Sequence, residues 1–269
     1  MESVPNPLID LSYTSDMAGR DAPDADPLAK YYRNVSFFTG HTIFFTCNFL
    51  NVFYMVLIQG LALRNLFKSR LLQLTLVGCF LQMMSCLTSL IRLSMNDEYS
   101  GWGKAGSALS YVGYNFMNYS CSYVIFKSNT KPILITTSVG TLIAIVGFVL
   151  EQITWDETDF WYFRIFVGIT TFFQCVSMYF GYHHLKKETI STDPSIISND
   201  AMKRLFLVLF ATDVLCIATM FSKLPYLLYP FTGVSYIVVV VMATYVSKME
   251  FAITTTSGTE EENKEILTP

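Results

Sequence analysis

The sequence predicts an all-α membrane protein: a seven-transmembrane-helix bundle with its N-terminus outside and its C-terminus in the cytoplasm. Three observations carry this prediction. Seven apolar segments each approach the ~20 residues that cross a bilayer. Only 14% of the residues are charged and the mean hydropathy is +0.41, whereas soluble domains average about 25% charged residues. The lysines and arginines between the segments are concentrated on one predicted side of the membrane.

The chain divides into a tail, a membrane domain and a second tail. Residues 1–35 are acidic and contain several prolines, so we expect a disordered extracytoplasmic tail. Residues 36–248 form the predicted membrane domain, and residues 249–269 an acidic, Ser/Thr-rich cytoplasmic tail. Because the connections are short except at 185–202, we expect an up-and-down bundle. The seven spans are predicted at 36–62, 70–94, 104–127, 131–151, 160–184, 203–222 and 226–247.

Basic residues set the orientation of these spans. With the N-terminus outside, the inner side holds Arg64, Lys68, Arg70, Lys127, Lys131, Lys186, Lys187, Lys203, Arg204, Lys248 and Lys264. The outer side holds Arg20, Lys30, Arg33, Arg92, Lys104, Arg164 and Lys223. The inner excess predicts an N-out, C-in topology. It also places an acidic loop at 151–159 outside, and a glycosylation sequon begins on that side at Asn34.

Asp213 is the most informative polar residue of the predicted spans, because we expect no other acid or base at such depth. It lies in the middle of the sixth span, where an aspartate costs about 2.5–3.5 kcal/mol on insertion scales. An ionisable group at this depth is a functional hypothesis by default. It can serve as the counter-ion of a cationic ligand, as a proton relay or as a sodium site, and it can also be a hydrogen-bonded packing residue.

The third span carries a polar stripe. Its members are spaced by four, four, three and four residues, which places them on one helix face: Ser107, Tyr111, Asn115, Asn118 and Ser122. Such a face must point into the bundle, because lipid cannot satisfy its hydrogen bonds. It either joins neighbouring helices or forms the wall of a polar cavity, and the number of polar groups favours a cavity.

Other polar positions complete the candidate site. Asn48 and Asn51 lie in the middle of the first span, where they can meet Asp213 or the stripe. Arg164 lies about one turn inside the fifth span and can face an outer vestibule. The predicted ligand- or ion-binding set is Asp213, Tyr111, Asn115, Asn118, Ser122, Asn48, Asn51 and Arg164. In the fourth span, Gly140, Ala144 and Gly147 form a small-residue face that allows close contact with another helix or another copy of the chain.

Several classes of function are disfavoured. The six cysteines and three histidines have no metal-ligand spacing, so we expect no metal and no cofactor. No catalytic constellation is visible, so we expect no enzyme. A net charge of −3 gives no support for a nucleic-acid partner.

The seven-helix topology resembles that of G-protein-coupled receptors and microbial rhodopsins. Residues 226–247 contain no lysine for a retinal Schiff base. Residues 123–127 do not match the acid-Arg-Tyr motif of rhodopsin-like receptors, and residues 229–233 do not match their Asn-Pro-x-x-Tyr motif. The remaining resemblance implies a divergent receptor-like protein that senses a small ligand. A cytoplasmic signalling partner would contact 185–204 and 249–269, with phosphorylation expected at Thr256, Ser257 and Thr259.

Two alternatives remain open. One is a proton- or ion-coupled transporter or channel that uses Asp213, and the other is a non-catalytic membrane scaffold. In each case the protein is integral to the plasma membrane or an endomembrane, with the lipid bilayer as its first partner.

Overall fold

The computed structural model describes residues 27–94, 101–126, 130–153, 165–176, 179, 199–220 and 227–266. At 27–34, 130, 199, 220 and 249–266 it describes the backbone alone. The described residues are helical apart from short turns at 63–64 and Ser69, so the predicted all-α class is confirmed.

The helices follow the order α1 (Pro27–Phe53), η2 (Tyr54–Ala62), α2 (Asn65–Lys68), α3 (Arg70–Ser94), α4 (Gly101–Phe126), α5 (Thr130–Ile153), the Ile165–Val176 helix, α7 (Asn199–Met220) and α8 (Leu228–Ile266). Each predicted span overlaps one of these helices or, for the first span, the continuous α1–η2 pair. Four of the described helices are long and apolar enough to cross a membrane: Val35–Ala62, Arg70–Ser94, Lys131–Ile153 and Leu228–Lys248. These four helices indicate an integral membrane protein.

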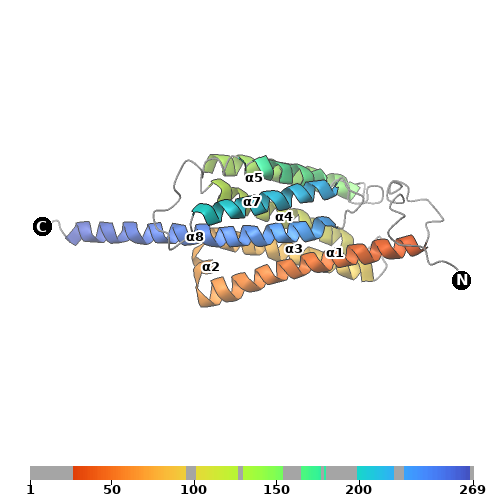
Figure 1. Cartoon of the computed structure of the whole chain (residues 1–269), viewed down its shortest axis with the longest axis horizontal. Coiled ribbons are helices and arrows are strands. Elements are labelled where there is room, and N and C mark those ends of the chain that lie inside the picture. The colour runs from red at the N-terminus through yellow and green to blue at the C-terminus, as the bar shows by residue number, and fades with distance from the viewer. Residues whose placement is uncertain are drawn as a thin grey trace.

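α8 is the central helix of the bundle. It contacts α1, α3, α4 and α7, and Figure 1 shows it running lengthwise among them. The most apolar stretch of its span is 67% buried, against 28%, 39% and 22% for the other three candidate spans. Around it, α3 packs against α1 and α4, and α4 packs against α5.

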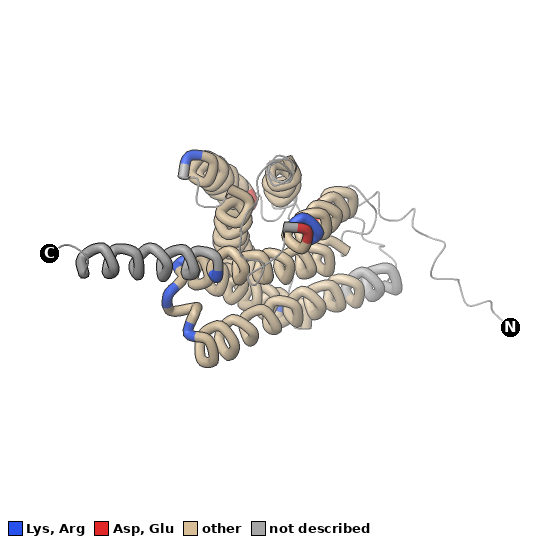
Figure 2. Tube along the Cα trace, turned by 60° about the vertical axis from the view of Figure 1, so that its left-hand side comes forward, with Lys and Arg blue, Asp and Glu red and all other residues tan. Residues whose placement is uncertain are grey.

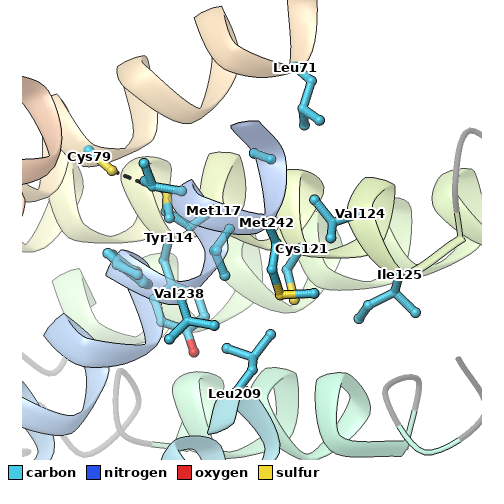
Figure 3. Packing of buried hydrophobic residues seen from close by; sticks show 14 of the residues in the cluster. Leu71, Cys79, Tyr114, Met117, Cys121, Val124, Ile125, Leu209, Val238 and Met242 are labelled. Atoms are coloured by element: carbon cyan, nitrogen blue, oxygen red, sulfur yellow. Dashed lines mark hydrogen bonds between the residues drawn. The ribbon is translucent and has the colours of Figure 1, made fainter. Parts of the chain in front are cut away.

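The interior combines apolar and polar side chains, whereas much of the outer surface is apolar. Figure 3 shows Tyr114 and Met117 of α4 near Val238 and Met242 of α8, with Leu209 of α7 below them. On the outside, α5 exposes Leu142, Ile145 and Ile153, and α1 exposes Phe49 and Phe53. An apolar exterior of this kind suits lipid as the surrounding solvent.

The first and the last helix both extend beyond the boundaries predicted from the sequence. α1 begins at Pro27, within the predicted tail, because proline is well tolerated at the first helical position. α8 continues to Ile266, beyond the predicted end at 247. No proline interrupts the chain between Lys248 and Ile266, and the single glycine there does not end the helix.

The first turn between helices contains two features that the sequence reasoning did not predict. The end of the first helix widens into the π-helix η2, with Leu63 N–H donating to Ile58 O at 2.9 Å. Arg64 then adopts a left-handed conformation with φ 54°, which lets the chain turn into α2.

The described basic side chains gather mainly at one end of the bundle. α1, α3, α4 and α5 alternate in direction, and the start of α1 and the end of α8 lie at opposite ends of the long axis (Figure 1). Figure 2 shows lysines and arginines around the η2–α2–α3 corner and where α8 leaves the bundle. The members of this basic end are Arg64, Lys68, Arg70, Lys131, Lys203, Arg204 and Lys248, while Arg92 and Lys104 lie at the other end.

Candidate functional site

Asp213 lies inside the bundle, on the face of α7 that packs against α8. Its side chain is 2% exposed, and its Oδ1 accepts a hydrogen bond from Ser235 Oγ of α8 at 2.9 Å. Among the described residues, its Oδ2 has no hydrogen-bond partner. A buried carboxylate with half of its acceptor capacity unused is costly, so this position is unusual for a purely structural residue.

The surroundings of Asp213 combine hydroxyl groups and aromatic rings. One helical turn away, Cys216 Sγ of α7 lies 3.6 Å from Thr232 Oγ1 of α8. Tyr114 of α4 lies within electrostatic range of Asp213, and its hydroxyl hydrogen bonds to Thr171 Oγ1 at 2.8 Å. The carboxylate therefore occupies the meeting point of α7, α8, α4 and the Ile165–Val176 helix.

The outer part of the stripe binds a second buried acid, Glu151. Tyr111 Oη donates to Glu151 Oε2 at 2.8 Å, and Ser107 Oγ donates to Glu151 Oε1. Glu151 is 1% exposed and belongs to the last turn of α5. Its assignment to the outer loop at 151–159 was therefore wrong, whereas Asp213 is still the acid expected in the middle of a predicted span.

A signal for Glu151 was present in the sequence. Gly140, Ala144, Gly147 and Glu151 are spaced by four, three and four residues, so the glutamate continues the small-residue face of α5. That face packs against α4, because a Cβ at Gly147 would lie 3.2 Å from Tyr111 Oη. The face is thus an internal contact, one of the two roles that the sequence left open.

The inner part of the stripe also joins helices. Asn118 Oδ1 accepts a hydrogen bond from Gln174 Nε2, and Ser122 Oγ accepts one from Thr136 Oγ1 at 3.0 Å. Asn115 is half-buried near Gly140 of α5. The stripe faces α5 and the Ile165–Val176 helix, and no hydrogen bond joins it to Asp213 within the described part of the chain. These contacts favour the role of joining neighbouring helices over the predicted role as the wall of a polar cavity.

The two asparagines of α1, Asn48 and Asn51, are buried inside the bundle. Asn48 Nδ2 donates to Phe44 O at 2.9 Å, but among the described atoms Asn48 Oδ1 and Asn51 Nδ2 lack hydrogen-bond partners. The Cys79 thiol beside Asn51 is a weak acceptor at best. Tyr236 Oη is also buried without a partner there. Asp213 bonds to the central helix α8, and no hydrogen bond connects it to the two asparagines in the described part of the bundle.

Sequence reasoning missed a polar cluster at the basic end. Gln59 of η2 is fully buried; its Nε2 donates to Tyr54 Oη at 2.8 Å and to Thr244 Oγ1 at 3.4 Å, and its Oε1 accepts from Asn65. Nearby, Ser69 Oγ and Ser247 Oγ are 2.8 Å apart. These bonds tie α8 to the η2–α2 corner immediately before α8 leaves the bundle.

The structure describes the remaining predicted site residues only in part or not at all. Arg164 lies outside the described residues, and the 185–204 connection lies mostly outside them. Thr256, Ser257 and Thr259 fall on α8 where the backbone alone is described. A groove of about 320 Å³ lies between α5 and the Ile165–Val176 helix and is lined by apolar residues such as Val146, Leu150 and Phe166. No group of three or more metal-ligating side chains occurs in the described part of the chain.

Comparison with protein-family models, with curated proteins and with solved structures finds no match. The site must therefore be interpreted from its own geometry.

Proposed function

We propose that this chain is a receptor-like protein of the G-protein-coupled type, with seven membrane helices, an outer N-terminus and a cytoplasmic C-terminus. In this proposal it is not an enzyme. A small ligand or ion binds at the interior site around Asp213 and changes the position of α8. A cytoplasmic partner then binds α8 in this position.

The packing supports seven membrane helices. α4 packs against α3 and α5, and α7 packs against α8, so both lie alongside candidate spans. A helix packed lengthwise against membrane-crossing neighbours shares their depth. α4 is not one of the four candidate spans, because it carries many polar side chains. These side chains face the neighbouring helices and form hydrogen bonds there. The Ile165–Val176 helix packs beside α4 in the same way through Thr171 and Gln174.

The distribution of basic residues supports the orientation. The η2–α2–α3 corner, the start of α5, the start of α7 and the exit of α8 all contribute to the basic end. By the positive-inside rule this end faces the cytoplasm. The start of α1 then faces outside.

The observation that carries the receptor proposal is the continuity of α8. One helix extends from Ser235, which binds Asp213, to Ile266 outside the bundle. At 1.5 Å per residue, the distance from Ser235 to the bundle exit at Lys248 is about 20 Å, and the distance to Ile266 is about 46 Å. A shift or rotation of α8 at the Asp213 contact would therefore reach a cytoplasmic surface without any hinge.

The cytoplasmic partner is expected at the projecting part of α8 and at the 185–204 connection. Thr256, Ser257 and Thr259 lie next to three consecutive glutamates, Glu260, Glu261 and Glu262. Phosphorylation there would add negative charge and acceptor oxygens that arginines of a partner can bind.

A reporter of G-protein signalling in cells tests the proposal. Wild-type chain should give output above that of cells without it. Met249→Pro should abolish the output at unchanged surface expression, because proline breaks α8 just outside the bundle, whereas Met249→Ala should retain it. Deleting 186–200 should also abolish the output. Equal output from the proline and alanine variants would contradict transmission through α8.

A transporter is the second candidate, and it is favoured by Asp213 Oδ2, which has no hydrogen-bond partner among the described residues. Proteoliposomes containing the purified chain would show a proton or cation flux that disappears in Asp213→Asn. Such a flux, together with no response in the signalling reporter, would replace the receptor proposal by transport.

A further inference from the structure

We propose that the interior site at Asp213 binds a monovalent inorganic cation of the Na⁺ class. The inference rests on the membrane location in the proposed function, but it does not depend on signalling. Its ligands would include the carboxylate of Asp213 and the hydroxyl oxygen of Ser235 on α8.

Charge balance is the first argument. Asp213 is 2% exposed, and among the described residues no lysine, arginine or histidine is bonded to it. An isolated charge in a low-dielectric interior is very costly, and one bound unit of positive charge removes most of that cost. Divalent cations would leave a net charge of +1 and usually require several carboxylates or retained waters. One carboxylate therefore matches one monovalent ion.

The available ligand atoms are the second argument. Asp213 Oδ2 is buried and has no partner among the described residues, so it can accept a ligand without breaking a hydrogen bond. Ser235 Oγ uses its proton on Oδ1, which leaves its oxygen lone pairs available. The hydroxyls of Tyr114 and Thr171 are bonded to each other, and among the described residues neither is hydrogen-bonded to the carboxylate. Oxygen donors of this hard type suit alkali cations rather than soft metals.

The tight packing around Asp213 is the third argument, and it disfavours an organic cation as the ligand. Leu209, Val238 and Val239 around the α7–α8 contact are 1%, 7% and 3% exposed. In the view of Figure 3, the side chain of Tyr114 extends from α4 toward Val238 and Leu209. The apolar groove of about 320 Å³ lies elsewhere, between α5 and the Ile165–Val176 helix. A small ion fits such a packed interior better than a molecule with its own carbon skeleton.

Thermal unfolding of the purified full chain in detergent tests the inference. The buried cysteines become accessible on unfolding, so a thiol-reactive dye reports the midpoint temperature. In NaCl, compared with choline chloride at equal ionic strength, the wild type should show a saturable rise of Tm. A rise of roughly 2–5 °C per tenfold increase in Na⁺ above the dissociation constant is expected from linkage. Binding of radioactive Na⁺ should saturate over the same range.

Asp213→Asn should remove both the Na⁺-dependent rise of Tm and the saturable binding. The matched control is Asp200→Asn on the same helix, because the Asp200 side chain is 80% exposed and pairs with Lys203 one turn away; it should behave as wild type. If Asp213→Asn does not fold, Ser235→Ala retains the carboxylate and should raise the dissociation constant for Na⁺ about 10-fold or more.

Three outcomes would overturn the cation site. One is a wild-type Tm equal in NaCl and choline chloride, accompanied by a higher Tm for Asp213→Asn, which would indicate a neutral carboxylic acid. Another is a Na⁺ effect that persists in Asp213→Asn, or in Ser235→Ala with an unchanged dissociation constant. The third is loss of the effect in Asp200→Asn. Since these measurements need no partner, they can fail while the signalling reporter responds, and the reverse is equally distinguishable.

Discussion

Two carboxylates, Glu151 and Asp213, are buried in the described part of the bundle, and they differ in how completely their oxygens are bonded. Each oxygen of Glu151 accepts a hydroxyl donor, one from Ser107 and one from Tyr111. Asp213 receives a donor on one oxygen alone among the described residues. A fully bonded group stabilises a structure, whereas a partly bonded one retains capacity for a ligand. We therefore assign Glu151 to stability and Asp213 to function.

A double-mutant cycle between Tyr111→Phe and Glu151→Gln tests the structural role of Glu151. Each single change should lower the free energy of unfolding by about 1–3 kcal/mol, because Tyr111→Phe removes a donor from a buried carboxyl oxygen and Glu151→Gln replaces one of the two acceptor oxygens by an NH2 donor. The effects should not be additive, since both changes act on the same pair of hydrogen bonds. Reversible unfolding in mixed detergent measures them. Tyr119→Phe on the same helix is the control, because Tyr119 is only half-buried. Additive effects would show that the pair is not coupled.

At the scale of elements, the contact between α3 and α4 depends on glycine. A Cβ at Gly113 would lie 3.1 Å from Leu81 Cβ and 3.2 Å from the backbone nitrogen of Gln82, while Gly101 has nothing within 4 Å. Both glycines belong to α4. Steric crowding, rather than helix propensity, therefore distinguishes them.

Gly113→Ala should destabilise the protein by about 1–3 kcal/mol, because the two helices must separate to admit the methyl group. Gly101→Ala should cause no loss and can stabilise, since alanine favours helix. Thermal unfolding of the two variants measures the difference. Equal Tm values would mean that α3 and α4 are not packed as closely as described.

A second contact between elements joins α8 to the start of α3. Ser69 Oγ lies 2.8 Å from Ser247 Oγ and also accepts Leu72 N–H at 3.3 Å, so it caps α3 as well as binding α8. Ser69→Ala should cost about 1–2 kcal/mol through the lost cap and contact. Ser247→Ala should cost less, about 0.5–1.5 kcal/mol. The order of the two Tm losses checks this, and the reverse order would refute the capping role.

At the scale of the whole molecule, the bundle keeps its polar groups inside and exposes apolar side chains such as Leu142 and Phe172. Most of its described basic residues lie at one end, which the proposed orientation places in the cytoplasm. An epitope tag at the N-terminus should therefore bind antibody on intact cells. A tag after Pro269 should bind only after permeabilisation, and the opposite pattern would invert the proposed topology.

Much of the molecular organisation was predictable from the sequence, because the cost of burying backbone and charge in lipid restricts a chain strongly. The apolar segments predicted the helices, and the position of Asp213 in the middle of one segment predicted a buried carboxylate. Glu151 was missed because it stands beside charged loop residues, although its spacing from Gly140 and Gly147 continued a buried face. η2 was missed because local propensity does not distinguish a π-helix from an α-helix.

The sequence by itself determined that the chain is helical, that several of its helices are apolar enough to cross a membrane, and that Asp213 lies in the middle of one predicted segment. Only the tertiary structure decided which helix is central and which partner each polar group meets. Periodicity assigns residues to a face, but it does not state which neighbour covers that face. For this reason the sequence assigned the stripe and Asp213 to one candidate site, whereas the stripe bonds to α5 and the Ile165–Val176 helix, and Asp213 bonds to Ser235 of the central α8.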